Sequence, residues 1–188
     1  MTTVPKLMTS EEFQRLPEPA GGERMELVQG VVVMTPPPTA GHGERAFEIG
    51  VAVRDFVRRH RLGLTIGEGG YRLRRDPDTV RAPDAAWIAF DRIPGGAFPA
   101  DDYPDAAPNL AIEVMSSHDR EMDIDEKVAD YLSAGCERVW VVRPRQRTIT
   151  VYRPDGNAHR FVVGDTLTSD DAGFPVDGFQ LPVARVFE

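Results

Sequence analysis

The sequence predicts a mixed α/β domain in which helices flank a β-sheet. The expected elements follow one another as helix, hairpin, helix, several strands, helix and further strands, an order typical of such a layered domain. With 188 residues, 41% of them hydrophobic, the chain can bury one sizeable core. The apolar run from Asn109 to Met115 is the best candidate for a central strand. We therefore expect a single domain over residues 1–188.

The first third of the chain carries clear start and turn signals. Thr9-Ser-Glu-Glu12 forms a capping box, which predicts a short helix that ends near Leu16. Residues 24–34 are expected to form two strands around Gln29-Gly30. A longer helix is predicted over residues 42–61, where apolar residues recur at helical spacing: Ala46, Ile49, Val53, Phe56 and Val57.

The remaining elements are mostly strands. Strands are expected at 62–66 and 71–74, and another within 80–90 that is broken or started at Pro83. Residues 92–108 have the composition of an irregular loop. A helix over 119–134 should end at Gly135. The final strands are expected at 137–143, 148–153, 159–163 and 179–187.

Composition limits the classes of function. The net charge of −8 argues against a protein that coats nucleic acid without specificity, although a local basic groove remains compatible with it. No apolar run approaches the ~20 residues that span a bilayer, and the N-terminus lacks a secretory pattern. The single cysteine, Cys136, excludes an internal disulfide. A cytoplasmic location is therefore expected.

Two acidic residues lie in strand-like apolar segments. Glu113 is the only charged residue between Asn109 and Met115, and Asp84 begins the apolar segment that ends at Phe90. A buried carboxylate is costly unless it is paired or binds a metal. Two such acids on neighbouring strands could share Mg²⁺ or Mn²⁺, which prefer oxygen ligands. Two alternatives remain, because Glu113 could pair with a buried arginine and Asp84 could be a turn residue after Pro83.

Lysine is scarce in this chain, which makes Lys127 informative. Of 22 Lys and Arg residues, only Lys6 and Lys127 are lysines. An ammonium near two metal-binding acids could orient a water molecule or stabilise charge on a phosphodiester during hydrolysis. The alternative is an ordinary surface ion pair with Asp123 or Asp130, which lie at helical spacing from it.

Several motifs resemble those of the bacterial Uma-two family of restriction-endonuclease-like proteins, within the PD-(D/E)xK nuclease superfamily. They occur in the family's order across about residues 9–160: Glu26-Leu-Val-Gln-Gly30, Pro36-Pro-Pro38 leading to His42, Arg81-Ala-Pro-Asp84, Leu110-Ala-Ile-Glu-Val-Met-Ser116, Lys127 with Tyr131 and Ala134-Gly135, and Val139-Trp-Val-Val-Arg-Pro144 with Val151-Tyr152. The resemblance implies a restriction-endonuclease-like mixed sheet with added β-hairpins. It also implies Mg²⁺- or Mn²⁺-dependent hydrolysis of nucleic acid, most simply DNA, at Asp84, Glu113 and Lys127.

The resemblance also has one departure and two accessory residues. The superfamily places a lysine two residues after the glutamate, where this chain has Met115, and the resemblance implies that Lys127 replaces it. Glu26 would be an additional acid of the site, or else an exposed residue of an edge hairpin. His42 could approach the site, although a surface position at the start of a helix is the simpler interpretation.

Three classes of function remain open at this stage. The first is an endonuclease, with Asp84 and Glu113 as metal ligands. The second is a nuclease-fold binding or regulatory module that no longer cuts, and the third is a structural protein whose strand acids are salt-bridged. Cleavage of both strands of a duplex requires two sites, so a homodimer is expected for the first class, with edge strands near 148–163 as one interface.

Overall fold

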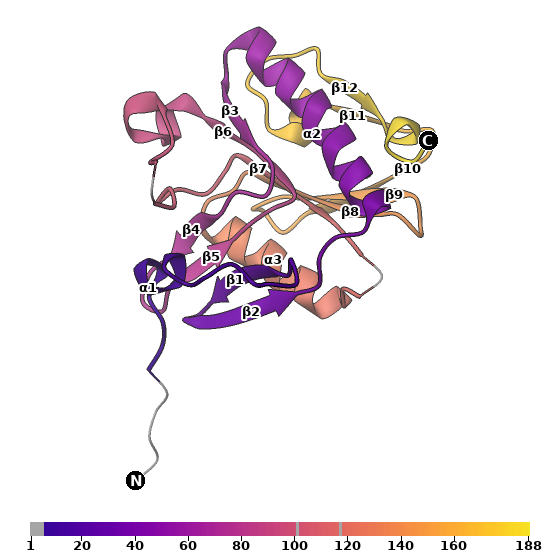
Figure 1. Ribbon diagram of the computed structural model, residues 1–188. Helices are drawn as coiled ribbons and strands as arrows, with labels where there is room; N and C mark the ends of the chain where they lie inside the picture. The colour runs from indigo at the N-terminus through magenta and orange to yellow at the C-terminus, as the bar shows by residue number, and fades with distance from the viewer. Residues whose placement is uncertain (1–5, 101, 117) are drawn as a thin grey trace.

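A six-stranded mixed sheet forms the centre of the computed structural model, which describes residues 6–100, 102–116 and 118–188 (Figure 1). Its strand order is β10-β9-β8-β7-β6-β3. Only β7 and β8 are parallel, and a helix connects them, as a crossover between parallel strands requires. The strands are β3 (Gly63–Ile66), β6 (Ala85–Ala89), β7 (Leu110–Val114), β8 (Arg138–Arg143), β9 (Thr148–Tyr152) and β10 (Ala158–Val162).

A second, four-stranded antiparallel sheet has the order β2-β1-β5-β4. Its hairpin turns at Gln29 and Gly30, whose φ angles of 50° and 77° both lie in the left-handed region. Two-residue hairpin turns of this kind match the twist of the strands, and glycine adopts the second position without strain. The strands are β1 (Arg24–Val28), β2 (Val31–Thr35), β4 (Tyr71–Arg74) and β5 (Thr79–Arg81).

Helices cover both faces of the central sheet (Figure 1). Helix α2 (Ala40–His60) lies on one face together with the C-terminal elements, and α3 (Glu121–Ser133) lies on the other. Gly135, with φ of 97°, ends the α3 segment in the conformation that glycine favours. The other short elements are α1 (Ser10–Gln14), η1 (Phe90–Arg92), η2 (Pro94–Gly96), α4 (Ser169–Ala172), η3 (Val183–Val186) and the strand pair β11 (Thr166–Thr168) and β12 (Gln180–Pro182).

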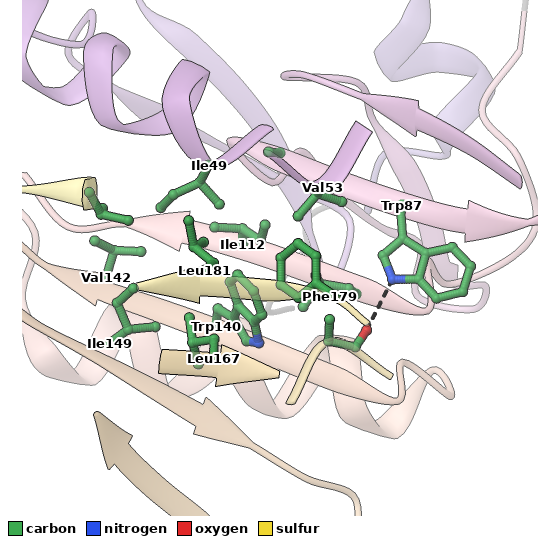
Figure 2. Close-up of a cluster of buried hydrophobic side chains, with 14 of the residues drawn as sticks. Ile49, Val53, Trp87, Ile112, Trp140, Val142, Ile149, Leu167, Phe179 and Leu181 are labelled. Atoms are coloured by element: carbon green, nitrogen blue, oxygen red, sulfur yellow. Dashed lines mark hydrogen bonds between the residues drawn. The ribbon is translucent and has the colours of Figure 1, made fainter. Parts of the chain in front are cut away.

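The largest core cluster lies between α2, the central sheet and the C-terminal segment (Figure 2). Leu167, Phe179 and Leu181 from that segment pack against strand residues. Both buried tryptophans donate their indole N–H to backbone carbonyls of α4: Trp87 to Ala172 at 3.0 Å and Trp140 to Asp171 at 2.7 Å. The C-terminal segment therefore completes the core on this face of the central sheet.

The predicted fold class is confirmed, and most elements lie where the sequence placed them. The capping box at Thr9 is present. The helix predicted over residues 42–61 is observed as α2, which begins two residues earlier and ends one residue earlier. The segment 80–90 divides at Pro83 into β5 and β6. The prediction for 179–187 was wrong in part, because β12 ends at Pro182 and a 3-10 helix follows. Within the described ranges, no helix has both the length and the apolar character that crossing a bilayer requires.

Candidate active site

The two strand acids lie next to each other at the centre of the molecule. Glu113 is on β7, and Asp84 immediately precedes β6. These strands are antiparallel neighbours in which Ala85 pairs with Ile112, so Asp84 is placed across from Glu113. Both are buried, with exposed fractions of 5% for Asp84 and 4% for Glu113. Strand alternation directs Leu110, Ile112 and Val114 toward α2, which leaves Glu113 on the α3 side.

Helix α3 supplies two direct partners for Glu113. The Lys127 ammonium donates to Oε2 at 3.0 Å, and the Tyr131 hydroxyl donates to Oε1 at 2.9 Å. Lys127 and Tyr131 are four residues apart, so they lie on one face of the helix. That face also carries Ile124 and Val128, whose burial against the sheet fixes the orientation of α3.

Glu26 enters the same cluster from the four-stranded sheet. Its Oε1 lies 3.3 Å from Lys127 Nζ and accepts the backbone N–H of Ala82 at 3.0 Å. Its Oε2 accepts from Arg81 Nη1 at 3.0 Å. Arg81 also pairs with Asp130 at 2.7 Å, which connects β5 to α3. The single ammonium of Lys127 is therefore shared between a carboxylate of each sheet.

Asp84 has a different set of partners. Arg24 donates to Oδ1 at 2.6 Å, and the Val114 backbone N–H donates to Oδ2 at 2.7 Å. The His42 Nε2 atom lies 3.2 Å from the same Oδ2. Arg24 also forms an ion pair with Glu68. Asp84 therefore joins the first turn of α2, strand β1 and the end of β7.

Burial and the neighbouring negative charges raise the pKa of Glu113. Burial raises the pKa of the Glu113 carboxyl to about 7; the charges of Asp84 and Glu26 add to this effect, and Lys127 opposes it. A buried acid with like charges beside it holds its proton more tightly, since its ionised form gains little solvation and meets repulsion. The ionised form of Glu113 is therefore much less favoured than that of an ordinary glutamate.

The other charged groups of the cluster favour their ionised forms. Burial opposes the Lys127 ammonium, but the charges of Glu113 and Glu26 outweigh it and raise its pKa. Burial likewise opposes ionisation of Glu26, yet the charges of Lys127 and Arg81 lower its pKa. Burial also opposes ionisation of Asp84, whose pKa is lowered by His42, the Val114 N–H and Arg24. The ammonium is shared by more than one acid, which is why Lys127 stays charged while Glu113 is only partly compensated.

Comparison with known proteins gives a consistent family and fold. Residues 10–184 match the family described as "Uma2: Putative restriction endonuclease". The chain belongs to the Uma2 family. This match extends the resemblance seen over residues 9–160 to nearly the whole chain. No curated protein matches the sequence.

A similar fold is found among solved structures. One of them is described as "Crystal structure of a putative nuclease belonging to DUF820 from Anabaena variabilis", and it superposes with a TM-score of 0.76. The alignment covers 96% of this chain and 97% of that chain, at 22% sequence identity. At this identity the likeness establishes the arrangement of the sheet and helices in this Uma2 member, and the chemistry must be argued from its own residues.

Several alternatives that the sequence left open for this Uma2 chain are not observed. The simpler interpretation of His42 as a surface residue fails, since its exposed fraction is 7% and it contacts Asp84. Glu26 is likewise buried and is not an exposed hairpin residue. Lys127 pairs with Glu113 and Glu26, whereas Asp123 pairs with Arg120. The buried partner of Glu113 is a lysine and a tyrosine instead of an arginine.

Three residues of the cluster had no predicted role: Arg24, Arg81 and Tyr131. Tyr131 lies one helical turn after Lys127, and this spacing could have identified it. Arg24 and Arg81 lie in strands, two residues before Glu26 and three before Asp84, so their sequence positions give a weaker signal. Arg24 meets Asp84 only where the two sheets come together, and Arg81 meets Glu26 across the β1–β5 pair of the four-stranded sheet.

The carboxylates of Asp84 and Glu113 suit a hard divalent cation such as Mg²⁺ or Mn²⁺. Each Glu113 oxygen accepts from one donor, and so does Asp84 Oδ1, which leaves a lone pair on each of these atoms. Across the described part of the chain, no three His, Cys, Asp or Glu side chains are grouped to hold one ion. These two acids would therefore hold a cation with water as its remaining ligands, a pattern typical of Mg²⁺.

Two pockets flank the buried face of α2 beside Asp84 and His42. One, here called the arginine pocket, has a volume of about 320 Å³ and includes Arg45, Arg143 and Arg145 in its lining together with His42. The other, here called the Phe47 pocket, has a volume of about 450 Å³ and includes Phe47 and Asp84. The first is lined by three arginines and two acids, Asp119 and Glu121, and the second is mostly apolar, so the two pockets suit different parts of a ligand.

Proposed function

We propose that this protein is a metal-dependent endonuclease that hydrolyses phosphodiester bonds of nucleic acid, with DNA as the first candidate substrate. The observation that carries the proposal is the convergence of Asp84, Glu113 and Lys127 in one buried cluster of a Uma2 chain. A buried glutamate whose pKa is raised beside a second acid would be stabilised by a divalent cation, because the cation would relieve their repulsion.

Each residue of the cluster has a distinct role in the proposal. Asp84 and Glu113 would hold Mg²⁺ or Mn²⁺, and the ion when bound would polarise the phosphodiester and acidify a water molecule. Lys127 orients the attacking water or stabilises negative charge on the phosphate. Glu26 holds the Lys127 ammonium in place, and His42 holds the Asp84 carboxylate. The expected products carry 5′-phosphate and 3′-hydroxyl ends.

The arginine pocket supports binding of a phosphate backbone near this cluster. Its lining holds three arginines and two acids, of which Glu121 pairs with Arg143 at 2.7 Å, so Arg45 and the exposed Arg145 are the cations that remain for a phosphate. The first turn of α2 also borders the pocket, and the N-terminus of a helix favours anions. Local positive charge of this kind compensates for the acidic chain as a whole when a polyanion binds. We infer that phosphates beside the scissile bond lie here.

A cleavage assay with three variants tests the function. Plasmid DNA, single-stranded DNA and RNA are incubated with Mg²⁺ or Mn²⁺, and cleavage should fall by about 100-fold or more for Asp84→Asn and Glu113→Gln. The matched control is Asp55→Asn, which changes an exposed acid on α2 and should leave cleavage unchanged. Cleavage that survives both site substitutions would refute the assignment.

The charge pairing also favours a second candidate, a nuclease-fold binding or regulatory module that does not cut. Arg24 neutralises Asp84 and Arg81 neutralises Glu26, so these two acids are compensated without a metal. Calorimetric titration with Mn²⁺ separates the candidates. Binding that disappears in Asp84→Asn supports the enzyme, and absence of binding to the unmodified protein supports the inert module.

The proposal includes a homodimer in the cytoplasm. Cleavage of both strands of a duplex requires two sites, and β10 is an edge strand of the central sheet that a second copy could contact. Cys136 is a buried free thiol, as expected for a reducing compartment. Sedimentation of the purified chain measures the oligomeric state directly.

A further inference from the structure

The Phe47 pocket is a hollow of about 450 Å³ that adjoins the candidate active site. Its walls come from α2, the end of β3 with the loop that follows, and residues 84–86. Asp84, a proposed metal ligand, is part of the lining. A volume of this size falls within the range of pockets that hold small ligands. A group bound in this hollow would therefore lie next to the phosphodiester bond that is proposed to be hydrolysed at Asp84.

One stripe of α2 shapes the pocket. Gly43, Phe47, Gly50 and Arg54 follow one another at spacings of four, three and four residues, so they lie on one helix face. A Cβ atom added to Gly43 would meet nothing within 4 Å, so this side of the pocket is open. Phe47 is 73% exposed, whereas Phe56 on the same helix is 6% exposed. The stripe therefore offers an exposed aromatic ring between two glycines, beside the hollow.

An exposed aromatic ring beside an acidic active site suits a flat, uncharged partner. The charged residues of the lining are Asp84, Glu68 and Arg54, and Arg24 pairs with both acids, so the pocket has no excess of positive charge to attract a phosphate. A nucleobase is planar and neutral, and bases stack on aromatic side chains regardless of sequence. The arginine pocket on the other side of the buried α2 face provides for the phosphates of the same strand.

We propose that Phe47 and its pocket bind an unpaired nucleobase next to the phosphodiester at Asp84. The substrate class of the proposed nuclease is therefore single-stranded nucleic acid, or a duplex in which one base is unpaired. This inference rests on the proposed function, but base binding does not require a cleavage step. A base inside a duplex is stacked on both faces, so it can reach Phe47 only after it leaves the stack.

The shape of the surface favours a base over a second copy of the chain. A stable protein interface buries ~800 Å² on each partner over a broad contact. The Phe47 pocket is instead a local hollow with a single protruding ring, and it is continuous with the lining of the acidic site.

Fluorescence of oligonucleotides that carry 2-aminopurine tests the proposal without cleavage. The full chain is titrated in EDTA with single-stranded DNA, single-stranded RNA and the matching DNA duplex. We expect the single strands to bind more tightly than the duplex and their 2-aminopurine emission to be quenched. Phe47→Ala should weaken single-strand binding by about 5- to 150-fold, and Phe47→Trp should retain it. The DNA and RNA arms identify which strand is preferred.

Two further variants separate binding from folding. Gly43→Leu places a side chain in the open space of the pocket and improves helix propensity, so it should block binding in a protein that remains folded. Phe90→Ala removes a phenylalanine that is 42% exposed and does not line the pocket, and it should bind like the unmodified chain.

Several outcomes would overturn the proposal. Equal binding by the unmodified chain, Phe47→Ala and Gly43→Leu would show that the pocket holds no base. Conversion of a dimer to a monomer by Phe47→Ala, with unchanged oligonucleotide binding, would assign this face to contact between copies. If the single strands bind through Phe47 but metal-dependent cleavage is absent, the proposed function fails and base binding stands.

Discussion

Replacement of Glu113 by glutamine should make the protein more resistant to unfolding at alkaline pH. The pKa of Glu113 is about 7 in the folded protein, against an ordinary value of 4.5. Between these pH values the folded protein keeps a proton that the unfolded chain has released, so the free energy of unfolding falls as the pH rises. The difference between 7 and 4.5, at about 1.36 kcal/mol for each pH unit, corresponds to about 3 kcal/mol.

The glutamine side chain isolates this effect. It has the length of glutamate and can accept from Lys127 or Tyr131, but it is neutral at every pH. Below about pH 4.5 the unmodified protein also carries a neutral side chain at this position in both states, and the titration of Glu113 contributes nothing there. Above about pH 7 its full cost is present. The stability of Glu113→Gln relative to the unmodified chain should therefore increase by up to about 3 kcal/mol across this window.

Urea unfolding in EDTA, followed by fluorescence of the buried Trp87 and Trp140, measures the effect at several pH values. The matched control is Glu126→Gln, which changes an exposed acid on α3 and should shift stability by about 0.5 kcal/mol or less at every pH. If the relative stability of Glu113→Gln stays constant or falls as the pH rises, Lys127 keeps Glu113 ionised and the reasoning is wrong.

Three further outcomes follow from the same contacts. Lys127→Met leaves two buried carboxylates without their shared ammonium, and it should lower the free energy of unfolding at about pH 8 by about 3–5 kcal/mol, measured by urea unfolding; a loss below about 1 kcal/mol would contradict a buried pairing role. Saturating Mn²⁺ should raise the melting temperature of the unmodified chain and leave that of Asp84→Asn unchanged, and an equal rise in both would remove Asp84 from the metal site. Leu181→Ala, at a fully buried position of the C-terminal segment, should cost about 2–5 kcal/mol in the same unfolding assay; a neutral result would show that this segment does not complete the core.

Local signals predicted most of the fold. The capping box at Thr9, the left-handed turn at Gln29-Gly30 and the stop at Gly135 depend on a few consecutive residues, and the structure contains all three. The C-terminal segment was predicted less well. Helix α4 spans only Ser169–Ala172, too short for a periodic pattern, and its carbonyls are positioned by the indoles of Trp87 and Trp140. Contacts so distant in sequence leave no local signal.

In the candidate site, too, residues with a local sequence signal were predicted, and residues placed by contacts distant in the sequence were not. A lone acid in an apolar strand singles out Glu113 from the sequence, because burial of an unpaired charge is costly. His42 had no such signal, since a histidine that opens a helix is commonly exposed. Its burial follows from the docking of α2 on the sheet next to Asp84. Arg24 and Arg81 were missed for a related reason, as their acidic partners lie 60 and 55 residues away in the chain.

The position of Lys127 on a helix changes what the lysine can do for the fold. A lysine at Met115 would follow Glu113 on the same strand, within the central sheet. From α3, the ammonium lies 3.0 Å from Glu113 on the six-stranded sheet and 3.3 Å from Glu26 on the four-stranded sheet. It therefore connects the two sheets as well as the two acids. Because the same ion pairs hold the site and join the sheets, loss of activity in a Lys127 variant does not by itself identify a chemical role. Glu26→Gln removes the negative charge that attracts Lys127 from the four-stranded sheet and keeps the ion pair with Glu113, so its comparison with Lys127→Met separates positioning of the ammonium from its action on the substrate.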